Sequence, residues 1–87
     1  MKVVIKVFGK LLDVFPRHIE MEFTQPVALH ELISKYVEKF APSTQKMFYD
    51  PKTTTLINGR NILTLMGFDT PLSDGDVVSF MPFVVGG

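Results

Sequence analysis

The sequence contains no cysteine, and this absence removes several kinds of chemistry at once. There can be no disulfide framework, and no thiolate cluster could hold zinc or an iron–sulfur centre. No side-chain thiol is available as a nucleophile either. A small β-rich fold built around an iron–sulfur cluster is therefore excluded, and we expect no metal site.

Net charge and long apolar runs are also absent. Nine Lys and Arg residues balance nine Asp and Glu residues, so no net field gathers a phosphate backbone or an anionic lipid surface. In the opening segment MKVVIKVFGKLL, three lysines (Lys2, Lys6 and Lys10) interrupt the apolar residues before a signal-peptide core can form. We therefore expect a cytoplasmic protein with neither nucleic acid nor membrane as a partner.

The remaining composition is that of one folded domain. The 87 residues are 46% hydrophobic and 21% charged, which is usual for a compact protein, and a core of this size cannot be divided. We expect a single domain over residues 1–87 with a flexible C-terminal tail at about residues 83–87.

Two segments near the N-terminus alternate apolar and polar residues, which is typical of strands. They are KVVIKVF at residues 2–8 and RHIEMEFT at residues 17–24, separated by a predicted loop or short turn at residues 9–16. The expected core positions are Val3, Ile5, Val7, Ile19, Met21 and Phe23. Two strands with a short connection predict a hairpin.

The segment ALHELISKYVEKF at residues 28–40 predicts a helix. Its apolar residues recur at i, i+3, i+4, i+7, i+8 and i+11 from Leu29, which forms one stripe. Pro42 ends the helix because proline cannot continue it. The polar, proline-bounded stretch from residue 41 to residue 55 is expected to be a long loop with one apolar anchor at residues 47–49.

Two short motifs predict tight turns. Asn58–Gly59 stands between apolar residues and accepts positive φ. SDGD at residues 73–76 precedes a final strand, VVSFMPF, with Val78 and Phe80 facing the core. We interpret Asp74 and Asp76 as turn residues and not as a catalytic pair. His18 and His30 have no neighbours that suggest a catalytic triad, so both are expected on the surface.

These elements together predict an α+β fold. One main helix must bury its stripe against a sheet of four or five strands. The preference for right-handed crossovers favours a mixed sheet with its first and last strands side by side in the middle.

The sequence ends in MPFVVGG, and two glycines add nothing to a core because they lack side chains. With glycine at roughly 7% of residues, two terminal glycines occur by chance in about one chain in 200. Glycine at both positions gives a thin backbone that can enter a narrow channel.

Taken together, LINGRNI, DTPLSDGDVVSFMP and the terminal Gly86–Gly87 resemble the MoaD/ThiS type of sulfur-carrier protein, above all the small subunit of molybdopterin synthase. The resemblance covers nearly the whole chain and implies the ubiquitin-like β-grasp fold. It further implies that the carboxylate of Gly87 is the reactive group. In that family an E1-like activating enzyme uses ATP and magnesium to adenylate this carboxylate, and a sulfur donor protein then supplies the sulfur.

The resemblance also assigns the partner that receives the tail. Gly86, Val85 and Val84 would lie in a channel of the synthase large subunit, where the thiocarboxylate of Gly87 delivers sulfur to a pterin precursor. The protein itself would bind no cofactor and would be a sulfur-donating subunit rather than an enzyme. Phe8, Met81 and Phe83 fall on strand positions opposite the core, and we expect them to form a docking surface for these partners.

Three other functions stay open. The same adenylated terminus could serve a ubiquitin-like modifier that is conjugated to lysines. It could instead serve a sulfur carrier of the thiamin pathway, although the length of residues 41–55 disfavours this. Finally, the chain could be a plain interaction domain with an inert terminus.

Overall fold

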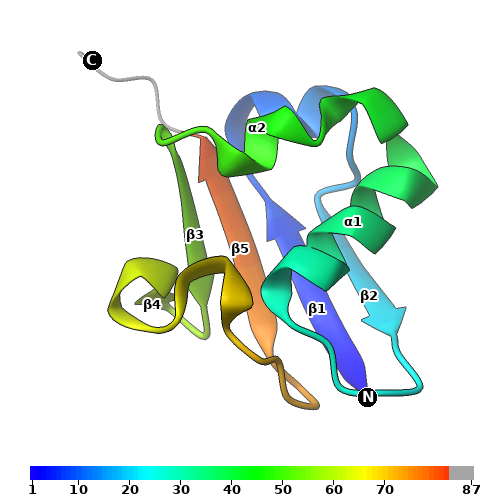
Figure 1. The fold of residues 1–87 in the computed structure, drawn as a ribbon. Coiled ribbons are helices and arrows are strands. Elements are labelled where there is room, and N and C mark those ends of the chain that lie inside the picture. The colour runs from blue at the N-terminus through cyan, green and yellow to red at the C-terminus, as the bar shows by residue number, and fades with distance from the viewer. Residues whose placement is uncertain (83–87) are drawn as a thin grey trace.

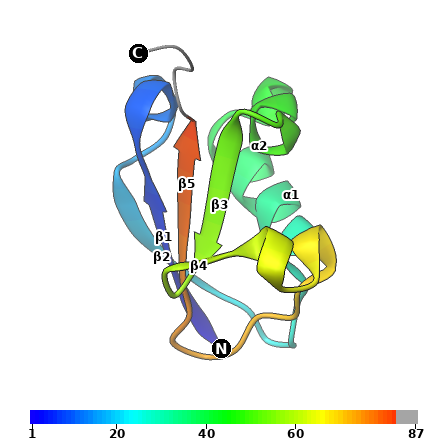
Figure 2. The same cartoon turned by 90° about the vertical axis from the view of Figure 1, so that its left-hand side faces the viewer.

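The computed structural model describes residues 1–82, in which five strands form one mixed sheet in the order β2-β1-β5-β3-β4. The strands are β1 (Lys2–Val7), β2 (His18–Glu22), β3 (Thr53–Ile57), β4 (Arg60–Asn61) and β5 (Val77–Pro82). The helices are η1 (Gly9–Asp13), α1 (Leu29–Phe40), η2 (Pro42–Thr44), α2 (Lys46–Tyr49), η3 (Ile62–Thr64) and η4 (Gly67–Asp69). Both α-helices cover one face of the sheet and leave the other face open (Figure 1, Figure 2).

The two central strands, β1 and β5, are parallel neighbours, as the sequence predicts. β1 also pairs antiparallel with β2, and β5 pairs antiparallel with β3. The alternation of β1 is confirmed, because Val3, Ile5 and Val7 are fully buried. This arrangement is the expected α+β architecture with one main helix.

The predicted core of the second strand is only partly right. Ile19, Met21 and Phe23 pack against the core but stay half-buried. The reason is that β2 is an edge strand, with a neighbouring strand on one side only. The alternation therefore gives the correct face and overstates the burial.

The main helix begins and ends where the sequence indicates. The carboxylate of Glu31 accepts the backbone N–H of Ala28 at 2.9 Å and so satisfies one free donor of the first turn. Its apolar stripe is buried against the sheet, and Pro42 follows the last turn.

The prediction of a long loop over residues 41–55 is wrong. This stretch contains η2, α2 and the first residues of β3. Phe48 of α2 is fully buried, and its ring lies 4.8 Å from that of Phe80 and 5.3 Å from that of Phe15, measured between centroids. Edge-on aromatic pairs of this kind add about 0.5–1.5 kcal/mol each beyond their burial. One aromatic anchor thus folds a segment whose polar composition suggests a loop.

The residues between β1 and β2 form a helical turn, η1, where the sequence indicates only a loop or short turn. Leu11 and Phe15 are buried there. The Phe15 ring stacks on Tyr36 of α1 at a centroid distance of 4.8 Å. The connection is therefore part of the core.

Candidate functional site

The central strand β5 carries the chain toward its C-terminus. The Phe8 backbone N–H donates to the Phe80 carbonyl at 3.1 Å, and Thr53 of β3 is the register partner of Pro82. Strands on both sides thus hold β5 along its length. The proposed reactive residue, Gly87, and the tail residues Phe83, Val84, Val85 and Gly86 lie outside the described residues.

Gly9 lies directly against the end of β5. Its φ is +65°, and a Cβ placed there would come within 3.3 Å of the Pro82 carbonyl oxygen and 3.4 Å of its Cγ. Both the left-handed backbone and the close approach require glycine at this position. This role of Gly9 was not predicted, and its only signal in the sequence was a glycine directly after the predicted strand.

Apolar side chains of β1, β3 and β5 alternate onto the sheet face opposite the helices, and the helices leave this face open (Figure 2). We define this sheet patch as Val4, Phe8, Leu56, Val77 and Met81. Phe8 is 40% exposed and the other four are half-buried.

Strand register brings the two described members of the predicted docking surface together. Val7 pairs with Phe80, so Phe8 and Met81 are the next neighbours along β1 and β5. Phe8 follows the last residue of β1, so the strand ends one residue earlier than predicted. Val4, Leu56 and Val77 were missed, although the same alternation places them on this face.

The two predicted turns are confirmed, and they bond to each other. Asn58 has φ +52° and Gly59 has φ +82°. The Asn58 side-chain amide donates to Asp76 Oδ1 at 2.9 Å, and Asn58 Oδ1 accepts the Val77 N–H at 2.9 Å. Asp76 also accepts the Ser73 N–H at 2.8 Å. Because its oxygens hold backbone and amide donors, Asp76 has a structural role.

Other titratable groups singled out above do not form a catalytic cluster. His18 and His30 are exposed, and His30 Nε2 lies 3.9 Å from Asp69 Oδ1. Tyr36 is buried, and burial raises the pKa of its hydroxyl to about 12. Its hydroxyl donates to the Pro16 carbonyl at 3.5 Å, which is a weak contact. No helix among residues 1–82 is long and apolar enough to cross a membrane.

Comparison with known structures identifies the class of protein. The chain is similar to Urm1 from Trypanosoma brucei, with 20% identity, coverage of 99% of this chain and 95% of that one, and a TM-score of 0.80. It is also similar to a Pyrococcus furiosus protein provisionally described as subunit 1 of molybdopterin converting factor, with 24% identity, coverage of 95% and 98%, and a TM-score of 0.76. A third likeness is to a chain in the complex of subunits 1 and 2 of molybdopterin-converting factor from Helicobacter pylori, with 24% identity, 100% coverage of both chains and a TM-score of 0.63. The fold is thus the ubiquitin-like β-grasp.

The family follows from a second comparison. Residues 5–87 match the ThiS family, so this chain belongs to the ThiS family. Among curated proteins, no sequence relative matches the chain. The family match confirms the resemblance that the turn motifs and the terminal glycines indicate.

Proposed function

We propose that this protein is a cytoplasmic sulfur carrier that acts as the small subunit of molybdopterin synthase. Its thiocarboxylated C-terminus donates sulfur to a pterin precursor in the biosynthesis of molybdenum or tungsten cofactor. The observation that carries the proposal is the match of residues 5–87 to the ThiS family, in a chain that carries Gly86–Gly87 at its end. A fully extended segment of five residues spans at most about 17 Å, a length that can enter a partner's active site while the domain stays outside.

The chemistry would take place at the carboxylate of Gly87. A carboxylate is a poor electrophile, so a carboxylate oxygen first attacks the α-phosphorus of ATP on the activating enzyme and pyrophosphate leaves. A sulfur nucleophile at the sulfide oxidation level then displaces AMP and leaves a thiocarboxylate. This group is ionised at neutral pH and acts as a soft nucleophile, as a low-pKa cysteine does elsewhere. ATP and magnesium are thus used by the activating enzyme.

The sheet patch would provide the docking surface. Phe8 and Met81 lie on the open face at the end of the sheet where β5 finishes. Exposed apolar side chains beside the tail can bury against the synthase large subunit and hold the tail in register with its channel. The complex of two subunits from Helicobacter pylori supports a stable assembly of this kind.

The experiment measures the intact mass of the full chain after incubation with the activating enzyme, ATP, magnesium and the sulfur donor protein. We expect one oxygen to be exchanged for one sulfur at Gly87. A matched variant with one alanine appended after Gly87 should gain no sulfur. Unchanged mass of the natural chain, or equal sulfur transfer by the extended chain, would contradict the proposal.

The likeness to Urm1 favours a second candidate function, which is conjugation to lysines of other proteins. Covalent high-molecular-weight adducts that disappear when Gly86 and Gly87 are deleted would support it. A third candidate, sulfur transfer in the thiamin pathway, is distinguished by the partner. Stable binding to a thiazole synthase and not to a molybdopterin synthase large subunit would favour that pathway.

A further inference from the structure

The charges of this protein balance in number but are separated in space. We call the end of the molecule where β5 finishes the Pro82 end, and the opposite end, which carries the N-terminus, the Met1 end (Figure 1). The Pro82 end carries six basic residues against three acidic ones: Lys6, Lys10, Arg17, Lys39, Lys46 and Lys52, with Asp13, Glu38 and Asp50. The Met1 end carries two basic side chains and the N-terminal ammonium against five acidic side chains: Lys2 and Arg60, with Glu22, Glu31, Asp69, Asp74 and Asp76. The charged side chains of a chain without net charge are therefore unevenly divided between its two ends.

The acidic groups of the Met1 end are largely used by the fold. Asp74 accepts the Lys2 backbone N–H at 2.7 Å, and Asp76 and Glu31 also accept backbone N–H groups. By contrast, the ion pairs found among residues 1–82 involve Lys2 and His30, and both belong to the Met1 end. The six basic side chains of the Pro82 end form no ion pair within the described residues. Their charge is available to a partner.

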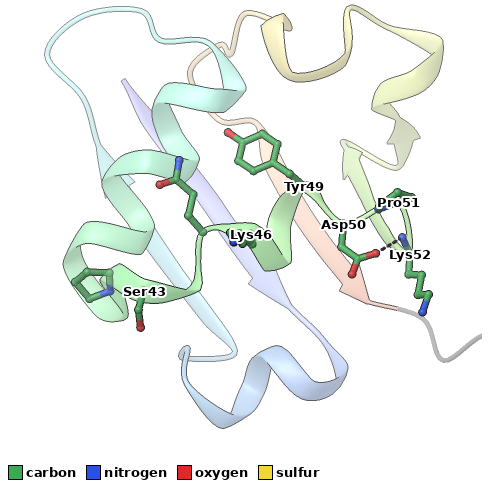
Figure 3. Close-up of a pocket in the computed structure, with 8 residues that line it drawn as sticks. Ser43, Lys46, Tyr49, Asp50, Pro51 and Lys52 are labelled. Carbon is green, nitrogen blue, oxygen red and sulfur yellow. Dashed lines mark hydrogen bonds between the residues drawn. The ribbon is translucent and has the colours of Figure 1, made fainter.

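A surface hollow lies at the Pro82 end, among its basic residues (Figure 3). It is an open depression of about 850 Å³ between α2 and the start of β3, lined by Lys46, Tyr49, Asp50 and Lys52 among others. Asp50 accepts the Lys52 backbone N–H at 2.8 Å, so one of its oxygens is held within its own turn. Lys46, Lys52 and Tyr49, which is 39% exposed, thus line the hollow with Asp50 as the one acidic residue among its lining.

The hollow lies next to the point where the tail begins. Thr53 follows Lys52 directly and pairs with Pro82 of β5. A protein that takes up the residues after Pro82 would therefore approach Lys52 and the hollow that Lys52 lines. Charge at this position acts on the same partner that receives the tail.

We propose that the hollow and the basic residues around it dock an acidic surface segment of the E1-like activating enzyme. This inference rests on the proposed function, because that enzyme would adenylate the carboxylate of Gly87. Opposite charges arranged in this way raise association rates by about 10 to 10³-fold and lose their effect as salt increases. A carboxylate-bearing protein segment fits better than nucleic acid, since three acidic residues interrupt the basic ones and the apolar sheet patch adjoins them.

The test compares two doubly charge-reversed chains in association with the E1-like activating enzyme of the same organism. One carries Lys46→Glu and Lys52→Glu, and the control carries Lys2→Glu and Arg60→Glu, which changes net charge equally at the Met1 end. At low salt we expect the first variant to associate at least about 10-fold more slowly than the natural chain, and the control within about 2-fold. At 0.5 M salt the difference should nearly vanish, because the Debye length then shrinks to about 4 Å. Thermal melting confirms that each variant is folded.

The outcomes separate this inference from the proposed function. Equal association rates for both variants, with normal sulfur transfer to Gly87, would overturn the acidic docking site and leave the sulfur-carrier function intact. Charge-dependent association without any mass change would support the docking site and contradict sulfur transfer. No association of the natural chain would overturn both. Tighter binding of a single-stranded oligothymidylate than of the activating enzyme at 0.15 M salt would assign the basic surface to nucleic acid instead.

Discussion

The two ends of this small domain are built by different means. At the Met1 end, two tight turns are specified by their own residues, Asn58–Gly59 and Ser73–Asp76, and their polar side chains bond to one another. At the Pro82 end, η1 and α2 are held by long-range contacts such as Phe48 with Phe80 and Gly9 with Pro82. Apolar and basic side chains remain unused at this second end. The end with free side chains is the one that leads to the proposed reactive residue, Gly87.

This difference indicates that the two ends have different roles, with the Met1 end stabilising the fold and the Pro82 end offering side chains to a partner. The Met1 end uses most of its acidic groups in its own turns and ion pairs, and its most exposed apolar residues, Leu63 and Met66, lie far from the end of β5. The Pro82 end keeps Phe8, Met81 and several lysines exposed or half-exposed beside the exit of the chain. Changes at the Pro82 end should therefore separate stability from partner binding, according to whether the side chain points into the core or out of it.

The largest expected effect comes from Phe48→Ala, which removes the anchor of α2. Loss of a fully buried phenylalanine should lower the free energy of unfolding by about 3–5 kcal/mol. Denaturant unfolding measures the loss. The neighbouring Tyr49→Ala is the matched control, because Tyr49 is 39% exposed and should cost less than about 1.5 kcal/mol. Similar losses for the two variants would show that α2 is not anchored through Phe48.

The features that could be predicted from the sequence are those that depend on local sequence patterns. Val3, Ile5 and Val7, the α1 stripe and the two turns were predictable because each depends on neighbours in sequence. The helix at residues 46–49 was not, because a polar segment gives no periodicity and Phe48 acts through contacts with distant rings.

The candidate site was likewise predictable only in part. The alternation of β1 and β5 placed Phe8 and Met81 on the open face, and the family resemblance assigned the terminus. The hollow beside Lys46 and Lys52 depends on the packing of α2 against the sheet, and the role of Gly9 depends on its distance to Pro82. Neither relation leaves a local pattern in the sequence.

The second prediction concerns the fixed end of β5. Gly9→Ala combines a left-handed backbone with a close approach to Pro82 and should cost about 2 kcal/mol of stability. Gly67→Ala is the matched control, since Gly67 has a similar φ of +60° and nothing lies within 4 Å of the added Cβ. The control should cost only about 1 kcal/mol, from the backbone alone. Equal costs in denaturant unfolding would mean that the approach to Pro82 is easily relieved.

A smaller effect is expected at the Met1 end from Asp76→Ala. This change removes the acceptor of the Ser73 N–H and of the Asn58 amide, at a cost of about 1 kcal/mol because the site is partly exposed to water. Since the change lies far from the tail, sulfur transfer to Gly87 should stay within about 2-fold of the natural rate. A large loss of transfer with little loss of stability would show that the Met1 end also contributes to function.

The smallest effect at neutral pH should come from Tyr36→Phe, because the hydroxyl makes one long hydrogen bond of 3.5 Å. The Tyr36 hydroxyl affects the free energy of unfolding mainly at high pH. Burial raises the pKa of Tyr36 from 10.0 to about 12 in the folded chain, so the unfolded chain releases the phenolic proton first. Stability from this group is complete below pH 10 and is lost as the pH rises toward 12. Unfolding free energies measured between pH 9 and 12 should therefore fall more steeply for the natural chain than for Tyr36→Phe, in which Tyr49, whose pKa is also raised by burial, still contributes. Parallel curves would show that the ring is less well shielded from water than its position beneath Phe15 and Phe48 indicates.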